Sequence, residues 1–306
     1  MTVNQSAGLE RQTTAGSSSW QSYAQLCKPR VVALIIYTAV VGMLLATPGF
    51  PDWQILLFAT LGIGMAAASG AAINHWVDRR IDAMMARTHR RPLPSGNVAP
   101  TNAIVFAILL GSVGLLILAM KVNVLTAVLT AISLIGYAVI YTVYLKPATP
   151  YNIVLGGAAG AAPPLIGWVA VTGTLDLPAL ILFGIVFMWT PPHFWALAIP
   201  RREEYARAGI PMLPVTHGVE HTKLQILIYV VILVAISTLP AAIGMSGTIY
   251  LLGAIMLGLA YIWHAAKLYR DPDNRHAMKA FGYSIVYLMA LFTIMLVDHY
   301  VSAPVS

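Results

Sequence analysis

The sequence predicts an all-α polytopic membrane protein with nine transmembrane helices, and three observations support this fold class. Charged residues make up only 9% of the 306 residues, whereas a soluble globular protein carries about 25%. Hydrophobic residues reach 58% and the mean hydropathy is +0.77. Charge-free runs also recur along the chain, each long enough for a membrane helix, which needs about 20 apolar residues.

The individual helices follow from these runs, taken in order along the chain. Most of the runs have the length of one helix. The run 224–266 is longer and contains Leu239-Pro240 and Gly244-Met245-Ser246-Gly247 near its middle, so we divide it into two helices. The predicted helix cores are 31–48, 54–76, 102–120, 123–144, 153–172, 179–199, 224–241, 249–267 and 281–299.

The basic residues predict the orientation of the bundle. Every Lys and Arg except Lys121 falls on the side that holds the N-terminus and the loops after the second, fourth, sixth and eighth helices. Because basic residues collect on the cytoplasmic side, this predicts an N-in, C-out topology. The net charge of +7 therefore reflects topology and does not indicate a nucleic-acid partner.

The predicted organisation is a tail followed by one domain. Residues 1–22 begin with a stretch rich in Ser, Thr and Gln, and they predict a disordered cytoplasmic tail. Residues 23–302 form a single transmembrane domain. Its cytoplasmic loops 77–101 and 200–223 contain acids, several His and many Pro and Gly, whereas the outer loops are short and plain. We therefore expect the functional site on the cytoplasmic face.

The most informative motif spaces Asn74, Asp78 and Asp82 four residues apart at the cytoplasmic end of the second helix. On a helix this spacing puts all three on one face. Two carboxylates and an amide oxygen are ligands that suit Mg²⁺, together with substrate phosphates. The alternative is a solvated helix end that Arg79 and Arg80 neutralise.

Arginines follow this motif at Arg87, Arg90 and Arg91, which suits a metal-bridged diphosphate held by guanidinium groups. Taken singly, each arginine could serve only to set the topology. The second loop is weakly similar to the first, because Glu203-Glu204 lie near a helix end and are followed by Pro and Gly residues. This similarity suggests a duplicated unit with two acidic clusters facing one cavity.

The chain resembles the haem-farnesylating branch of the UbiA superfamily of intramembrane prenyltransferases, over nearly its whole length after the tail. The residues that carry the resemblance are Lys28-Pro29-Arg30, the Asn74/Asp78/Asp82 run with Arg87-Thr88 and Arg91-Pro92-Leu93, Tyr141-Thr142, Leu145-Lys146, Asn152–Gly157, Gly160–Pro164, Gly167-Trp168, Thr190–Ala198 and Ala208–Val215. Within these, Pro191-Pro192-His193-Phe194-Trp195 and Pro211-Met212-Leu213-Pro214-Val215 distinguish this branch from quinone and chlorophyll prenyltransferases.

The resemblance implies a UbiA-type helix bundle and a specific reaction. The farnesyl group of farnesyl diphosphate is transferred to the 2-vinyl group of haem B with addition of water, which gives haem O and diphosphate. Haem B is then a substrate, and the cofactor is one or two Mg²⁺ ions. The expected location is the bacterial cytoplasmic (inner) membrane, with the active site facing the cytoplasm. Haem O would pass to a haem A synthase or a terminal oxidase.

The resemblance also implies roles for particular residues. Asn74, Asp78 and Asp82 are the expected metal-binding and catalytic residues, together with one acid of the second loop. That acid is Glu204 in our prediction, and Glu203 is its competitor. The expected diphosphate-binding residues are Lys28, Arg30, Arg87, Arg90, Arg91, Lys146 and Asn152.

The porphyrin and the allylic cation need further groups. His193 is the first candidate for contact with haem and His217 is the second; an interhelical hydrogen bond is the alternative role for His193. Aromatic rings can stabilise the allylic cation through cation–π contacts, although ordinary packing is an alternative for each of them. The ring candidates are Tyr141, Tyr144, Trp189, Phe194 and Trp195.

Three other functions fit the sequence less well. A transporter or channel usually carries ionisable groups within the membrane, whereas the acids here cluster at the cytoplasmic helix ends. A CDP-alcohol phosphotransferase has a different acid spacing. A UbiA-type prenyltransferase that acts on an aromatic quinone precursor is the remaining alternative, and the Pro191–Trp195 block argues against it.

Overall fold

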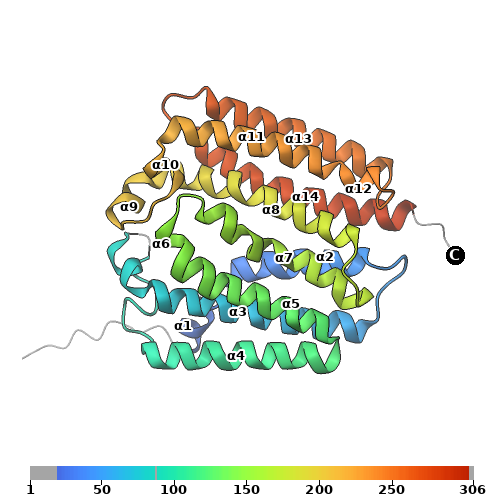
Figure 1. Ribbon diagram of the computed structural model, residues 1–306, viewed down its shortest axis with the longest axis horizontal. Coiled ribbons are helices and arrows are strands. Elements are labelled where there is room, and N and C mark those ends of the chain that lie inside the picture. Colours follow the sequence, from blue (N-terminus) through green and yellow to red (C-terminus); the bar gives the residue numbers. More distant parts are fainter. Residues whose placement is uncertain (1–18, 87, 303–306) are drawn as a thin grey trace, which may run out of the picture.

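The computed structural model describes residues 19–86 and 88–302, and in this part of the chain every regular element is a helix (Figure 1). The first half of the chain forms α1 (Ser19–Leu26), α2 (Pro29–Leu45), α3 (Trp53–Met84), α4 (Pro100–Lys121), α5 (Val124–Ile135), the π-helix η1 (Gly136–Leu145) and α6 (Lys146–Ala148). The second half forms α7 (Asn152–Thr172), α8 (Leu177–Ala198), the 3-10 helix η2 (Ile199–Arg201), α9 (Arg202–Arg207), α10 (Leu213–Thr216), α11 (Val219–Ser237), α12 (Leu239–Ala242), α13 (Thr248–Tyr269) and α14 (Ala277–Ser302).

Each of the nine predicted cores is mostly helical in the structure, and the bounds agree within five residues except at the end of α3, which continues from the predicted residue 76 to Met84. Among the described residues, eight helical segments are long and apolar enough to cross a membrane. The remaining predicted core corresponds to α2, which has 17 residues. It reaches the length of a span only together with α1, and the two helices are bent by 54° where they meet.

The structure corrects the predicted ends of several elements. α3 continues to Met84, so the start of the predicted loop 77–101 is helical. The predicted loop 200–223 contains η2, α9, α10 and the first turn of α11. α1 begins at Ser19, so residues 19–22 are helical although we assigned them to a disordered tail. The rest of the predicted tail, residues 1–18, lies outside the described residues.

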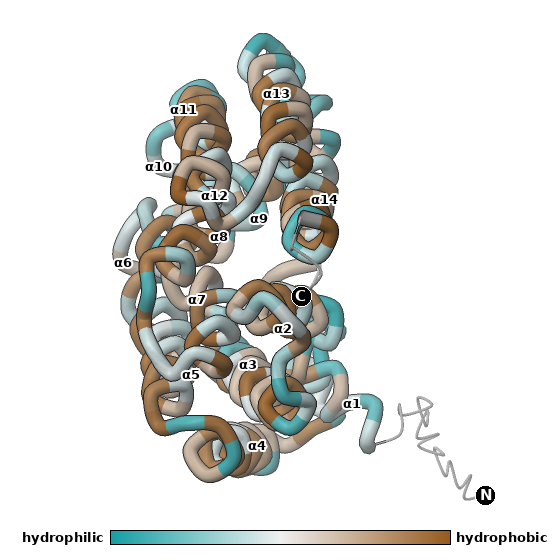
Figure 2. The backbone as a smooth tube through the Cα atoms, turned by 90° about the vertical axis from the view of Figure 1, so that its right-hand side faces the viewer, coloured by the Kyte–Doolittle hydropathy of each residue, from teal (hydrophilic) through white to brown (hydrophobic). Residues whose placement is uncertain are grey.

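The long helices run side by side, and α3, α7 and α8 are the most deeply buried of them. Apolar residues cover the outward sides of the peripheral helices such as α4, α11 and α13 (Figure 2). This pattern follows from the composition, because a bundle in lipid exposes apolar side chains and encloses its polar groups.

Small residues bring α2 and α7 into backbone contact. A Cβ atom on Gly42 would lie 2.1 Å from the carbonyl oxygen of Pro164, and one on Gly167 would lie 2.0 Å from the carbonyl oxygen of Ala39. Helices in a membrane associate mainly by close packing, for which glycine is suited. These two helices therefore form a tight centre for the bundle.

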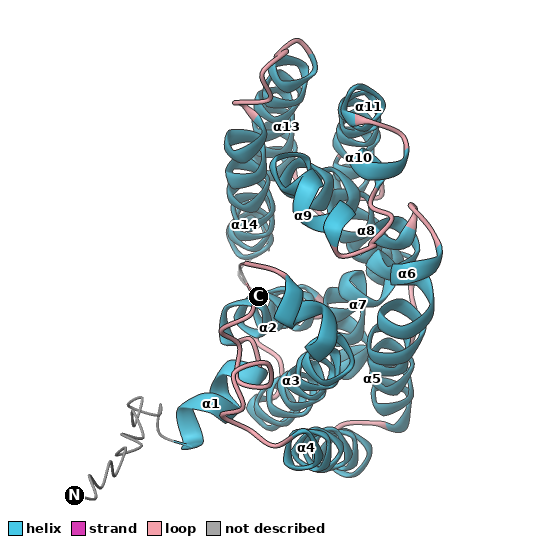
Figure 3. Cartoon of the chain, turned by 90° about the vertical axis from the view of Figure 1, so that its left-hand side faces the viewer, coloured by secondary structure: helices cyan, strands magenta, loops and turns pink. Residues whose placement is uncertain are grey.

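Three of the short helices lie at one end of the bundle. α6, α9 and α10 gather there, close to the end of α3 (Figures 1 and 3). At the opposite end, the buried carboxylate of Asp298 on α14 accepts hydrogen bonds from the backbone N–H groups of Gly247 and Tyr250. These bonds satisfy free N–H groups at the start of α13 and fix it to α14.

Candidate active site

The acidic motif lies on one face of α3, as its spacing predicts. Asn74, Asp78 and Asp82 are each at most 5% exposed. The side-chain amide of Asn74 donates to Oδ2 of Asp78 at 3.0 Å, so the motif forms a connected stripe near the end of the helix. Burial of two carboxylates is costly unless cations compensate them.

Three cations meet this stripe, each from a different part of the chain. Lys28 Nζ donates to Oδ1 of Asn74 at 2.5 Å, and Lys146 Nζ lies 2.6 Å from Oδ2 of Asp78. Arg91 donates to both carboxylate oxygens of Asp82, at 3.0 and 2.8 Å. Three positive groups thus face two carboxylates, which leaves a net positive charge suited to a polyanion.

Lys28 occupies the break between α1 and α2 in a left-handed backbone conformation, with φ of 48°. This conformation is unfavourable for a residue other than glycine and is maintained by its surroundings, here including Pro29 at the start of α2.

The π-helix η1 supplies a polar contact that the sequence did not predict. The hydroxyl of Thr142 accepts a hydrogen bond from the amide of Asn74 at 3.2 Å and donates to the carbonyl oxygen of Tyr137 at 2.8 Å. π-helices are rare and often lie at functional sites. Here the wider turn leads directly into Lys146, so η1 orients both Thr142 and Lys146 toward α3.

Two stacked tyrosines of η1 lie beside the polar stripe. The rings of Tyr137 and Tyr141 are 5.7 Å apart with an angle of 13° between their planes. Tyr137 packs against Gly70, which precedes Asn74 by one turn of α3, and Tyr141 packs against Gly156 of α7. The pair therefore forms an aromatic wall in which Tyr137 lies beside Gly70, one turn before Asn74.

The other predicted diphosphate-binding residues are placed differently. The buried amide of Asn152 donates to the carbonyl oxygens of Lys146 and Thr149, at 3.3 and 2.8 Å, so Asn152 fixes the turn that carries Lys146. Arg30 and Arg90 are exposed, and neither forms an ion pair within the described part of the chain. Arg87 lies outside the described residues.

The two acids of the second loop differ in their surroundings. The Glu203 side chain is 85% exposed and pairs with Arg207 at 3.1 Å. Oε2 of Glu204 is buried and has no hydrogen-bond partner among the described residues. Its neighbour Tyr205 packs in an apolar cluster that also contains Ile81 of α3. The structure thus turns Glu204, not Glu203, into the protein.

The described residues contain no group of three His, Cys, Asp or Glu side chains that could hold a metal ion. Glu204 therefore does not join Asp78 and Asp82 in one such group. The stripe on α3 offers two carboxylates and the amide oxygen of Asn74, which are hard oxygen ligands. Such a set fits Mg²⁺, because this ion is usually held by one or two carboxylates and completes its shell with water and phosphate oxygens.

His193 is buried within α8 among aromatic rings and bound to α14. It stacks on Trp189 with a centroid distance of 4.2 Å, and its Nδ1 lies 2.6 Å from Oγ of Ser284. The Ser284 hydroxyl donates to the carbonyl oxygen of Phe281 at 2.5 Å. Ser284 must then accept from Nδ1–H of His193, which leaves the lone pair of Nε2 free.

His217 lies apart from His193, between α10 and α11, where it is exposed. Its Nδ1 is 2.8 Å from the hydroxyl of Thr216, and its ring is 6.2 Å from that of Tyr151. No contact joins it to His193. The predicted aromatic candidates are likewise dispersed, since Tyr144 is exposed and Trp195 packs against Tyr229 of α11.

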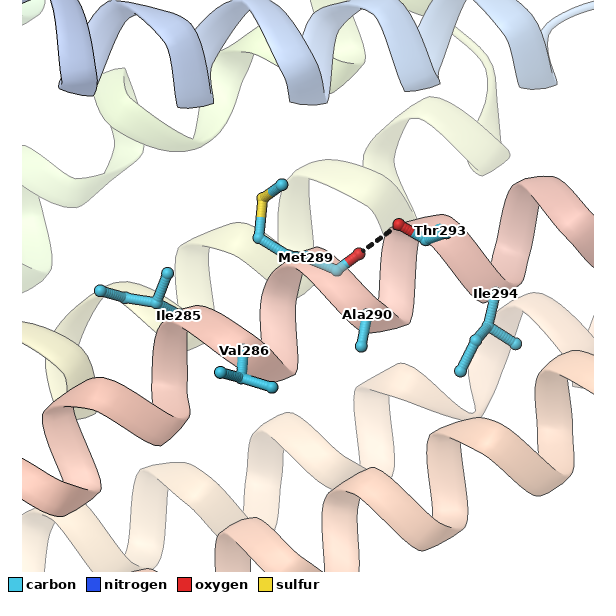
Figure 4. A pocket seen from close by; sticks show the side chains of 6 residues that line it. All are labelled: Ile285, Val286, Met289, Ala290, Thr293 and Ile294. Carbon is cyan, nitrogen blue, oxygen red and sulfur yellow. Dashed lines mark hydrogen bonds between the residues drawn. The ribbon is translucent and has the colours of Figure 1, made fainter.

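An apolar groove of about 440 Å³ lies along α14 (Figure 4). The hydroxyl of Tyr37 from α2 donates to the carbonyl oxygen of Met289 at 3.0 Å and lies 2.8 Å from Oγ1 of Thr293. No charged group lines the groove, in contrast to the stripe on α3. The lining residues are Ile285, Val286, Met289, Ala290, Thr293 and Ile294.

Comparison with known sequences gives consistent matches across the chain. Residues 35–294 match the UbiA prenyltransferase family. A protein of Thioalkalivibrio sulfidiphilus named protoheme IX farnesyltransferase is 61% identical over 93% of this chain and 94% of its own length. A protein of the same name from Marinobacter nauticus is 56% identical over 97% of this chain and 98% of its own length.

Comparison with solved structures identifies the fold. The structure of a digeranylgeranylglyceryl phosphate synthase superposes with a TM-score of 0.79 at 21% identity, covering 93% of this chain and 99% of that one. A UbiA homologue from Archaeoglobus fulgidus, bound to DMAPP and Mg²⁺, superposes with a TM-score of 0.66 at 17% identity. That comparison covers 90% of this chain and 99% of that one.

Proposed function

The chain belongs to the UbiA prenyltransferase family, and on this premise we propose that it transfers the farnesyl group of farnesyl diphosphate to haem B. The farnesyl group adds to the 2-vinyl group, water supplies a hydroxyl, and haem O and diphosphate are the products. The name shared by relatives that are 61% and 56% identical supports haem B as the acceptor. The observation that carries the transfer chemistry is the buried stripe of Asn74, Asp78 and Asp82 facing three cations.

The diphosphate binds where these charges meet. Lys28, Arg91 and Lys146 are already directed at the stripe, and Asn152 holds the turn that presents Lys146. Arg30 and Arg90, which are exposed, would contribute further positive charge, and Arg87, outside the described residues, remains a predicted diphosphate-binding residue. Oxygen ligands from Asn74, Asp78 and Asp82 would hold one Mg²⁺ ion, and Glu204 would help to hold a second through the diphosphate.

Catalysis consists of stabilising the charge that separates when the allylic C–O bond breaks. Mg²⁺, when bound, acts as a Lewis acid on the diphosphate leaving group. Lys28, Arg91 and Lys146 neutralise the same developing negative charge in a site from which water is largely excluded. The rings of Tyr137 and Tyr141, next to the Asn74 end of the stripe, would stabilise the positive allylic carbon through cation–π contacts.

His193 of α8 is the first candidate for contact with the acceptor. His193 keeps its Nε2 lone pair free because Ser284 fixes the Nδ1–H tautomer, and this is the form that can ligate haem iron. His217, at the exposed end of the same half of the chain, is the second candidate for contact with haem.

The membrane arrangement follows from the charges. The protein is an integral membrane protein, and we propose nine spans, with α1 and α2 counted as one, in an N-in, C-out orientation. All basic residues except Lys121 then lie on the cytoplasmic side of the bacterial inner membrane, together with the active site. Haem O would leave this side of the protein or pass within the bilayer to a haem A synthase or a terminal oxidase.

A product assay tests the proposal. Purified protein in lipid nanodiscs is supplied with haem B, farnesyl diphosphate and Mg²⁺, and the haems are separated by reversed-phase chromatography and identified by mass. We expect a more hydrophobic haem with the mass of haem O, loss of this product with EDTA, and its return with excess Mg²⁺. Turnover of 4-hydroxybenzoate in place of haem B would contradict the proposal and indicate a quinone-type prenyltransferase.

A further inference from the structure

A second polar site lies at the corner between α13 and α14, at the same end of the bundle as α9 and α10 (Figure 1). A cleft of about 420 Å³ is present there, lined by Trp263, Ala266, Lys267, Arg270 and Asp271. We propose that this cleft binds the headgroup of an anionic phospholipid such as phosphatidylglycerol, with the phosphate on Lys267 and Arg270 and an acyl chain along α13.

The cations of this corner are available to a ligand. Lys267 of α13 and Arg270, the C-cap residue of that helix, are three residues apart and so project from neighbouring positions. Lys279 of α14 belongs to the same corner, since it and Lys267 act electrostatically on both His264 and His276. Lys267, Arg270 and Lys279 are exposed and make no ion pair with the described residues, unlike the cations at the stripe on α3.

The acid that lines the cleft forms no ion pair with any of these three described cations. The carboxylate of Asp271 accepts hydrogen bonds from the backbone N–H groups of Asp273 and His276, at 3.0 and 2.8 Å. The buried Lys223 of α11 donates to the carbonyl oxygen of Asp271 at 2.6 Å and also pairs with Glu220. These bonds fix the loop after α13, so the cleft is formed before a ligand arrives.

Aromatic rings brace the corner on its inner side. Nδ1 of His264 lies 2.9 Å from Nε2 of His276, and the ring of Tyr283 stacks on His264 at 4.5 Å. Trp263, on the outer side, is 55% exposed, and Lys267 Nζ lies 4.9 Å from its ring. An exposed Trp beside a Lys is typical of the level at which lipid headgroups lie.

An apolar stripe continues from the cleft toward the middle of the membrane. Trp263, Leu259, Met256 and Leu252 are separated by four, three and four residues, which places them on one face of α13, and all four are exposed. A cationic cleft joined to such a stripe matches an amphipathic ligand. Free phosphate and an acidic protein surface have no apolar chain that could pack on the stripe. Basic pockets near the ends of membrane helices bind anionic headgroups.

Native mass spectrometry of the detergent-solubilised full chain tests this inference with three probes: phosphatidylglycerol, phosphatidylcholine and inorganic phosphate. We expect phosphatidylglycerol to bind more tightly than phosphatidylcholine. The double variant Lys267→Gln/Arg270→Gln should weaken phosphatidylglycerol binding by about 30-fold, because each basic residue near an anionic lipid contributes about fivefold. The matched control Arg275→Gln removes a charge from the same loop that is already paired with Asp273, and it should retain the affinity of the parent.

The remaining outcomes decide against the inference. Equal binding of both phospholipids, or unchanged phosphatidylglycerol binding by the double variant, would show that the cleft is not the site. Competition by inorganic phosphate at concentrations equal to those of the lipid would show a simple phosphate site. The exposed positions make unfolding of the variants a small risk, and an unchanged melting temperature together with unchanged prenyl transfer verifies that they are folded.

Discussion

Lys146 Nζ lies 2.6 Å from Oδ2 of Asp78, although 68 residues separate them in the sequence. The contact depends on the π-helix η1, which ends at the residue before Lys146, and on the Asn152 amide that binds the Lys146 carbonyl oxygen. Both side chains are nearly buried, at 16% and 5% exposure. The pair therefore links the end of α3 to the short segment between η1 and α7, which the sequence places far from it.

Lys146→Met tests whether this lysine serves the diphosphate. The variant removes one of three cations near the stripe, so farnesyl diphosphate should bind about 10- to 100-fold more weakly, as expected from loss of a charged hydrogen bond of about 1.5–3 kcal/mol. The KM for farnesyl diphosphate is the measurement. Lys146→Arg retains the charge and should recover part of the affinity, whereas Lys121→Met, at an exposed site outside the cluster, should change nothing. A normal KM in Lys146→Met would refute the role.

Glu204→Gln and Glu203→Gln form a matched pair for the second acidic loop. Glu204 has a buried carboxylate oxygen without a partner, whereas Glu203 is exposed and pairs with Arg207. We expect Glu204→Gln to lower kcat by about 100-fold if the carboxylate acts on the bound diphosphate. Glu203→Gln should stay within about twofold of the parent, since exposed ion pairs contribute little.

Stability distinguishes a functional Glu204 from a structural one. A buried carboxylate oxygen without a partner is costly, so replacement of Glu204 by a neutral amide should leave the melting temperature unchanged or raise it slightly. A lower melting temperature in Glu204→Gln, with activity lost in proportion, would indicate a structural role. Equal loss of activity in both variants would contradict the assignment of Glu204 over Glu203.

The sequence predicted those parts of the site that depend on helix periodicity. Asn74, Asp78 and Asp82 share a face of α3 because their spacing matches the helix repeat, which needs no tertiary information. Their partners depend on how distant segments pack. Lys28, Arg30, Arg90 and Arg91 were equivalent candidates in the sequence, yet only Lys28 and Arg91 reach the stripe. Thr142 belongs to the Tyr141-Thr142 pair of the family resemblance, but its contact with Asn74 was not predicted, because it results from a π-helix that hydrophobic patterning does not reveal.

The helices of the fold were also predictable from the sequence, because their positions depend on local patterns and not on tertiary packing. Charge-free runs located every long helix, since the cost of charge in a bilayer marks the ends of the spans. The bend between α1 and α2 was missed because Lys28 and Pro29 read equally well as a loop before a straight helix. Choosing between Glu203 and Glu204 by geometry also required the structure, since adjacent residues on a short helix face different directions.

His193→Ala and Ser284→Ala test the proposed haem contact. Ser284 fixes the Nδ1–H tautomer and so leaves Nε2 free to act on iron. Outer partners of a ligating His change metal affinity by about 10- to 100-fold, so Ser284→Ala should weaken haem B binding by about tenfold, and His193→Ala should weaken it further. The Soret spectrum and haem titration measure the effect. Farnesyl diphosphate binding is the internal control, and equal weakening of both ligands would indicate that His193 serves only in packing.

Gly156→Ala tests whether the aromatic wall must keep its position. A Cβ atom at Gly156 would lie 2.1 Å from Cδ2 of Tyr141, so the ring must move away from its present contact. Overpacking of this kind costs about 1–3 kcal/mol, and we expect both a lower melting temperature and slower prenyl transfer. Gly160→Ala is the matched control, one turn along the same helix, because its added Cβ has no neighbour within 4 Å. The double variant Gly156→Ala/Tyr141→Leu should recover stability but not activity, since the smaller side chain relieves the clash and removes the ring. Recovery of both would show that Tyr141 is needed only for packing, and an unaffected Gly156→Ala variant would show that its contact with Gly156 does not constrain the ring.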